Sequence, residues 1–127
     1  MTRLDVPTSR QCEFVDITTQ VQSAVTEMAI ADGVITVFVP HTTAGITINE
    51  NADPDVTADI AGALTQCVPW NAGYAHAEGN SAAHVKASLM GNSAQILVEN
   101  GQLQLGTWQA IYFCEFDGPR QRHVWTK

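Results

Sequence analysis

The sequence has few cations. Six lysines and arginines stand against 13 acidic residues, which gives a formal net charge of -7 at pH 7. A protein face that binds the phosphate backbone of nucleic acid has to be basic. The cations here are scattered, apart from Arg120, Arg122 and Lys127 near the C-terminus, so we expect no nucleic-acid partner. This small cluster could still bind a small anion, because local charge matters more to a pocket than net charge does.

Long apolar runs are absent and cysteine is scarce. No window approaches the length needed to cross a bilayer, and residues 1–8 lack an apolar core flanked by cations. We therefore expect a cytoplasmic protein with no membrane partner. The three cysteines, Cys12, Cys67 and Cys114, are widely spaced and form no Cys-x-x-Cys pair. We interpret them as small buried hydrophobic residues rather than redox or metal groups.

What is present is the composition of a folded protein. Of the 127 residues, 45% are hydrophobic and 15% are charged, which is enough apolar material for a core without disulfides. No internal repeat and no low-complexity segment interrupts the chain. We expect a single domain over residues 1–127.

Apolar periodicity predicts strands and two to three helices. Alternating or β-branched runs predict strands over 10–15, 34–39, 46–48, 94–99, 102–105, 108–116 and 120–126. The run 34–39 is nearly all apolar and should be buried on both faces, with 46–48 returning beside it. Helical spacing predicts helices over 17–28, 54–67 and 81–89. The sequence thus favours an α+β fold, a compact α/β sandwich with a largely antiparallel sheet.

Turn and cap signals fix several of these boundaries. Asp53 can cap the second helix, with Pro54 at its first position. Asn100-Gly101 is a strong hairpin signal between two strands. If Gly118 and Pro119 turn the chain into its last strand, Glu115 lies opposite Arg122 on one face.

Three of the four histidines lie in polar segments. His41 follows the apolar strand, His76 lies in the loop 69–80, and His84 lies in the first turn of the next helix. Neutral imidazole is a common zinc ligand, and three of them leave a catalytic position open. The spacing lacks the one-turn pair of a zinc helix, so capping or hydrogen-bonding histidines explain it equally well. His123 has no obvious partner, and we interpret it as a surface residue.

Carboxylates and hydroxyls complete the candidate site. Glu50 and Asp59 could join a metal, orient an imidazole or act as a general base, while solvated charges or cap contacts are the alternative. Thr42 and Thr43 could bind phosphate or simply stabilise the turn.

Four motifs carry a resemblance to a known family. They are His41-Thr42-Thr43-Ala44 with Asn49-Glu50-Asn51, His76 followed by Gly79-Asn80 and Ala83-His84-Val85-Lys86, Gly106-Thr107-Trp108-Gln109, and Asp117-Gly118-Pro119-Arg120. In this order and spacing they resemble the YjbQ-like family, small proteins of unestablished function, some of which are named secondary thiamine-phosphate synthases. The resemblance covers nearly the whole chain.

The resemblance implies a compact α/β homotrimer whose histidine-bearing segments gather in a cleft. Assembly would use the apolar surface of Trp108, Trp125 and Tyr112. The family's histidine positions match His41, His76 and His84, and its acidic and polar positions match Glu50, Asp59, Asn80, Gln109, Glu115 and Arg120.

The reaction attributed to the family joins a hydroxymethylpyrimidine diphosphate to a thiazole phosphate and releases pyrophosphate. Such chemistry needs a divalent cation, here zinc, magnesium or manganese, and positive groups for the leaving diphosphate. On this hypothesis the three histidines hold the metal, Glu50, Asp59 and Arg120 take part in catalysis, and the phosphorylated substrate meets Thr42, Thr43, Asn80, Lys86 and Gln109. Two alternatives stay open: a metal-dependent hydrolase of a small phosphate or ester, and a non-catalytic module that binds a metal or a small anion.

Overall fold

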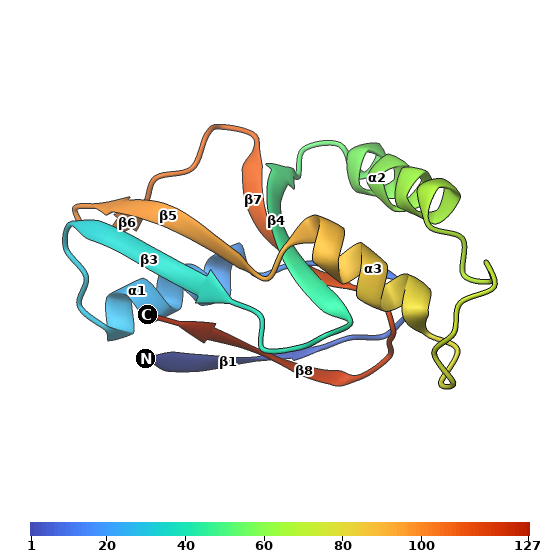
Figure 1. Ribbon diagram of the computed structural model, residues 1–127. Helices are drawn as coiled ribbons and strands as arrows, with labels where there is room; N and C mark the ends of the chain where they lie inside the picture. The colour runs from blue at the N-terminus through green and yellow to red at the C-terminus, as the bar shows by residue number, and fades with distance from the viewer.

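Two antiparallel sheets and three helices make up the structure, a computed structural model that describes residues 1–127 (Figure 1). The strands are β1 (Thr2–Pro7), β2 (Glu13–Asp16), β3 (Gly33–Phe38), β4 (Ala44–Glu50), β5 (Ser93–Glu99), β6 (Gln102–Leu103), β7 (Gln109–Glu115) and β8 (Gln121–Thr126). The helices are α1 (Thr18–Glu27), α2 (Pro54–Cys67) and α3 (Ser81–Met90). None of them is long and apolar enough to cross a membrane.

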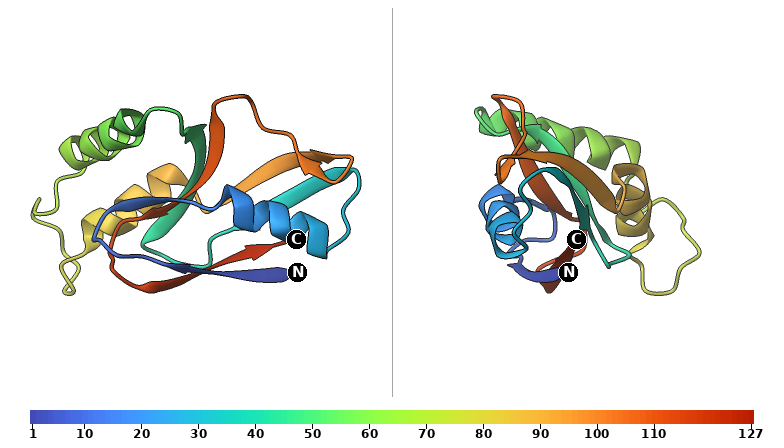
Figure 2. Two further views of the ribbon diagram at one scale, coloured as in Figure 1. Left: turned by 180° about the vertical axis from the view of Figure 1, so that it is seen from behind. Right: turned by 90° about the vertical axis from the view of Figure 1, so that its left-hand side faces the viewer.

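The strands divide between a large and a small sheet. The large sheet has the order β1-β8-β3-β5-β6 and the small sheet has the order β2-β7-β4. Every strand pair is antiparallel. The predicted α+β class with antiparallel pairing is therefore confirmed. Figure 2 shows α1 and α3 on opposite sides of the molecule, with the sheets between them.

Alternation along β7 builds two apolar clusters. Ile111 and Phe113 pack into the main core with the buried face of α1 and the inner face of the large sheet. Tyr112 and Cys114 point the other way and pack with Ala83 and Ala87 of α3 in a second cluster. Successive side chains of a strand face opposite sides, so this one strand anchors α1 on one side and α3 on the other.

A close backbone approach fixes α3 against β4. Gly45 has no side chain, and a Cβ there would lie 2.7 Å from the carbonyl oxygen of Gly91 at the end of α3. That same oxygen accepts a hydrogen bond from the Ile46 N–H at 3.0 Å. The end of α3 consequently lies beside the beginning of β4, and His84 in the first turn of α3 lines a cavity together with His41 of the β3–β4 connection.

The predicted helix-cap and hairpin residues lie where the sequence indicates. Asp53 caps α2 by accepting from the Asp55 N–H at 2.9 Å, and Pro54 opens the helix. Asn100 and Gly101 both have positive φ, as the tight β5–β6 hairpin requires. Helix α3 begins at Ser81 as predicted, although its N-cap residue is Asn80.

Several predictions that depend on strand partners and burial are wrong. Strand β1 was missed, and the strand predicted over 10–15 begins only at Glu13, because both lie at sheet edges where the alternation is weak. Strand β3 is buried on one face only, since Val34 is 46% exposed. Strand β4 pairs with β7 and not with β3. Cys67 is exposed on α2, a helix with no buried residue.

The last strand, β8, does not pair with β7 as the sequence suggested. The turn at 117–120 passes the chain from β7 in the small sheet to β8 in the large sheet. Glu115 and Arg122 still meet, through their side chains rather than as cross-strand neighbours. This crossing brings β8 beside the β3–β4 connection, where the candidate site lies.

Candidate functional site

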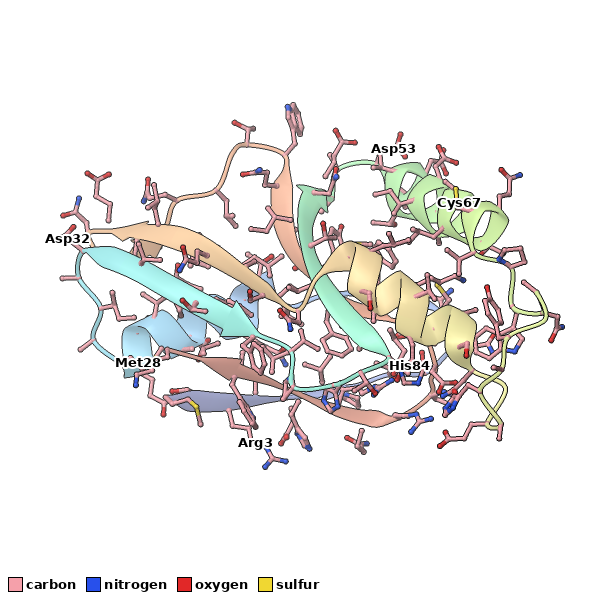
Figure 3. All side chains as sticks on the ribbon, in the orientation of Figure 1. Arg3, Met28, Asp32, Asp53, Cys67 and His84 are labelled. Atoms are coloured by element: carbon pink, nitrogen blue, oxygen red, sulfur yellow. The ribbon has the colours of Figure 1, made fainter.

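A polar cavity of about 490 Å³ lies where the β3–β4 connection, the α2–α3 connection and the β7–β8 turn meet. It brings together seven residues that the sequence singled out: His41, Thr42, Thr43, His76, Asn80, His84 and Arg120. Arg122 and Glu78 also line it. We call it the arginine cavity. Figure 3 labels His84 near this end of α3, where nitrogen-bearing side chains gather.

A second cavity of about 550 Å³ adjoins the first and shares His41, Thr42 and His84 with it. Its remaining wall consists of small or neutral residues, among them Ser88 and Asn92. We call it the serine cavity. We call the two adjoining cavities together the cleft, which has an arginine-lined end and an uncharged end.

His41 is fixed at the boundary between these two ends. Its Nε2 accepts a hydrogen bond from the His123 backbone N–H at 2.9 Å, and its ring stacks on the His123 ring with centroids 6.1 Å apart. Burial lowers the pKa of His41, and the neighbouring charge of Arg122 lowers it further. The ring is therefore neutral near pH 7 and carries its proton on Nδ1.

His76 and His84 form a pair across the arginine cavity. Their rings are perpendicular, with centroids 5.5 Å apart. The Nε2 of His76 also lies 4.0 Å from Glu78 Oε1. These contacts place two imidazoles next to the same space.

A buried ion pair supports the floor of the arginine cavity. Glu115 is fully buried and accepts hydrogen bonds from Nε and Nη2 of Arg122, which is only 4% exposed. Thr8 Oγ1 donates to the same carboxylate at 2.7 Å. Burial raises the pKa of Glu115, but the hydrogen bonds from Arg122 and Thr8 outweigh it, so the pKa lies below its ordinary value.

Arg122 connects this pair to the cleft. Its Nη2 donates to Thr43 Oγ1 at 2.8 Å, which fixes the hydroxyl of a predicted site residue. Arg122 belongs to the C-terminal cation cluster for which anion binding was considered, but it was not assigned to the histidine site. Its predicted opposition to Glu115 is the signal that could have placed it there.

Arg120 and Asn80 share one carboxylate. Both Asn80 Nδ2 and Arg120 Nη2 donate to Asp117 Oδ2 at 2.9 Å. Asn80 Oδ1 is buried and has no hydrogen-bond partner. Asn80 is the N-cap residue of α3 and makes no side-chain cap bond, while its backbone oxygen accepts from the Ala83 N–H at 3.0 Å. The N-terminus of a helix favours a nearby anion.

Four predicted site residues lie outside both cavities. Glu50 is at the far end of β4, where its carbonyl accepts from the Tyr112 hydroxyl. Asp59 is exposed on α2. Gln109 Oε1 accepts from the Gly106 N–H at 2.7 Å within a turn. Lys86 is buried on the side of α3 that packs near Cys12.

His123 is not the unpartnered surface residue that the sequence suggested. Its Nδ1 lies 2.9 Å from Asp5 Oδ1, and its Nε2 contacts the Arg3 guanidinium. Together with the backbone bond to His41, these contacts make His123 a support for the cleft.

The arrangement of the histidines does not fit a three-histidine metal site. No group of three or more His, Cys, Asp or Glu side chains is arranged to hold a metal ion. The Nε2 lone pair of His41 is already used by the His123 N–H, and its Nδ1 would have to lose a proton before it could bind a metal. The sequence predicted metal binding by the three histidines, and this geometry gives that prediction no support.

Comparison with known proteins gives consistent matches over the whole chain. The family model described as UPF0047 protein YjbQ-like matches residues 2–127. UPF0047 proteins of Methanocaldococcus jannaschii and Bacillus subtilis are each 50% identical over 125 residues, covering 98% of this chain and 91% and 95% of theirs.

Solved structures agree with the sequence matches. A YjbQ/UPF0047 protein from Clostridium acetobutylicum has a TM-score of 0.98 at 58% identity and covers 100% of this chain and 98% of its own. A YbjQ-like protein of unknown function from Sulfolobus solfataricus has a TM-score of 0.93 at 36% identity, covering 98% of this chain and 91% of its own.

Proposed function

The chain belongs to the UPF0047 YjbQ-like family, and we propose that its arginine cavity binds the phosphate group of a small phosphorylated molecule. The observation that carries this proposal is the convergence of Arg120, the Thr42-Thr43 turn and the N-terminus of α3 on one polar cavity. Guanidinium, hydroxyl and helix N–H groups are the donors that proteins use for phosphate.

Arg120 supplies the accessible guanidinium of this site. Both arginines pair with a carboxylate, but Arg122 and its partner Glu115 are buried, whereas Arg120 is exposed beside Asp117. The Arg120 side chain is 52% exposed. Its Nε donates to the Asp117 backbone oxygen and its Nη2 donates to Asp117 Oδ2. Since a guanidinium has five N–H donors, several remain for an incoming phosphate.

The two imidazoles of His76 and His84 give the site proton-transfer chemistry. A phosphate or diphosphate leaving group needs a proton or a positive charge as it departs. The pair stands at the same cavity as Arg120, which supports a reaction at phosphorus or at the carbon that bears the phosphate.

Thiamine-phosphate formation is the first reaction to assay. It is the reaction attributed to the family, and it uses two phosphorylated substrates, each of which would bring a phosphate group to the arginine cavity. Product above that of a His84→Ala control, with added magnesium, manganese or zinc, would support the synthase. Turnover of one phosphate ester alone would indicate a hydrolase, and saturable binding without product would indicate a binding module.

Calorimetric titration with inorganic phosphate and pyrophosphate tests the binding proposal directly. Arg120→Ala should weaken binding about tenfold to a hundredfold, because it removes a charge-assisted hydrogen bond. Lys127→Ala is the matched control, since it removes one exposed cation at the chain end, away from the cleft. Equal affinity in the Arg120 variant and the parent protein would refute the proposed site.

Assembly as a homotrimer is proposed alongside this function. Trp108 is 62% exposed and Trp125 is partly exposed beside Phe38, which leaves apolar surface for a second copy to cover. Tyr112 does not contribute, because it is buried in the second apolar cluster. Sedimentation of Trp108→Asp and Trp125→Asp variants tests the assembly, and an unchanged trimer in both would exclude these residues from the interface.

A further inference from the structure

The serine cavity differs in chemistry from the arginine cavity beside it. Its wall carries the hydroxyls of Thr42 and Ser88, the amide of Asn92 and the imidazoles of His41 and His84. No lysine, arginine, aspartate or glutamate lines it, and its only hydrophobic side chains are the methyl groups of two alanines. This compartment offers many neutral hydrogen-bonding groups and little apolar surface.

From this composition we infer that the molecule bound in the cleft is a phosphate ester of a sugar or another polyhydroxylated compound. The inference rests on the proposed phosphate site and names the class of molecule attached to that phosphate. His41, Thr42 and His84 line both cavities, and we therefore place the group attached to a phosphate at Arg120 in the serine cavity.

The donors and acceptors in this cavity match hydroxyl groups. His41 presents Nδ1–H as a donor, because its Nε2 accepts from the His123 N–H. Ser88 Oγ donates to the His84 carbonyl oxygen at 2.9 Å, which leaves its lone pairs free to accept. Asn92 is exposed and its amide can both donate and accept. A hydroxyl is likewise donor and acceptor, so it can satisfy each of these partners.

An aromatic or aliphatic group would be held less well. One face of the His41 ring is stacked on His123, and Phe113 meets the ring edge-to-face behind it. The remaining apolar surface is that of Ala44 and Ala87. A hydrocarbon group would therefore displace water from hydrogen-bonding side chains without replacing those bonds, which is unfavourable.

Titration calorimetry with three probes tests the inference: inorganic phosphate, ribose 5-phosphate and phenyl phosphate. We expect ribose 5-phosphate to bind at least about tenfold more tightly than phenyl phosphate. Ser88→Ala and Asn92→Ala should each weaken ribose 5-phosphate about threefold to tenfold and leave inorganic phosphate unchanged. Ser93→Ala is the matched control, because Ser93 is exposed next to Asn92 but does not line the cavity.

The outcomes separate this inference from the phosphate proposal. If Arg120→Ala weakens phosphate binding but phenyl phosphate binds as tightly as ribose 5-phosphate, the phosphate site stands and the sugar phosphate is excluded. Equal ribose 5-phosphate affinity in the Ser88 and Asn92 variants and the parent also overturns the inference. If none of the three probes binds, both proposals are wrong. Backbone amide shifts at Ser88 and Asn92 that respond to ribose 5-phosphate and not to phosphate would confirm the placement.

Discussion

Removing the charge of Glu115 should destabilise the protein strongly. Glu115 is fully buried and is the only carboxylate hydrogen-bonded to Arg122, which is itself buried. Breaking a buried ion pair by removing one partner costs about 3–5 kcal/mol, because the other charge is left without compensation. For Glu115→Gln we expect the lower end, about 3 kcal/mol, since the amide oxygen can still accept from one guanidinium nitrogen. That is a large part of the roughly 5–15 kcal/mol that stabilises a typical domain.

Urea unfolding followed by tryptophan fluorescence measures this effect at one protein concentration. The unfolding midpoint should fall while the slope with denaturant stays constant. Glu99→Gln is the matched control, because it removes the charge of an exposed glutamate on β5. The double variant Glu115→Leu/Arg122→Met removes both charges together and should be more stable than Glu115→Gln alone.

The pH dependence of stability gives a second measurement on the same pair. The folded pKa of Glu115 is lowered, so its stabilising contribution is present above the ordinary glutamate pKa of about 4.3 and is lost as the pH falls through the lower folded value. The parent protein should lose stability more steeply than Glu115→Gln in that range. A Glu115→Gln cost no larger than that of Glu99→Gln would refute the reasoning, because it would show that Arg122 does not depend on this carboxylate.

Three further predictions concern the cleft. Gly45→Ala should lower the unfolding free energy by about 1–3 kcal/mol, because its Cβ would meet the Gly91 carbonyl oxygen at 2.7 Å; unchanged urea unfolding would show that α3 can shift freely. His41 should titrate below the ordinary histidine range in NMR spectra, since burial and the charge of Arg122 lower its folded pKa, and titration at or above the ordinary value would contradict that placement. Because no three donors are grouped, elemental mass spectrometry should find well under one metal ion per chain, whereas stoichiometric metal lost from His76→Ala and His84→Ala would establish a metal site.

The parts of the fold that follow from local chemistry could be predicted. The start of α2 depends on Asp53 and Pro54, and the β5–β6 hairpin depends on Asn100 and Gly101, all of which act within a few residues of their own position. The gathering of His41, His76 and His84 at one cleft came from the family resemblance, since their spacing alone left it open.

The parts that depend on distant partners could not be predicted. Periodicity shows that β4 and β8 are strands but does not select their neighbours, because the pairing of β4 with β7 and of β8 with β1 joins segments far apart in the sequence. Glu50 and Asp59 were assigned to the site as carboxylates suited to it and as positions that match the family, and neither argument fixes where the side chain lies. In the structure β4 carries Glu50 away from the cleft, and α2 holds Asp59 in solvent.

The chain passes from β7 in the small sheet to β8 in the large sheet, and this crossing explains how the cleft keeps its shape. Consecutive residues of β8 reach the β3–β4 connection by different groups: Arg122 donates from its side chain to Thr43, and His123 donates from its backbone to His41. Arg122 is in turn fixed by Glu115 of β7. The groups that would meet a ligand are thus positioned before it arrives, which reduces the entropy lost on binding. The same connection means that a change at Glu115 should alter the cleft as well as the stability of the fold, although Glu115 itself lines neither cavity.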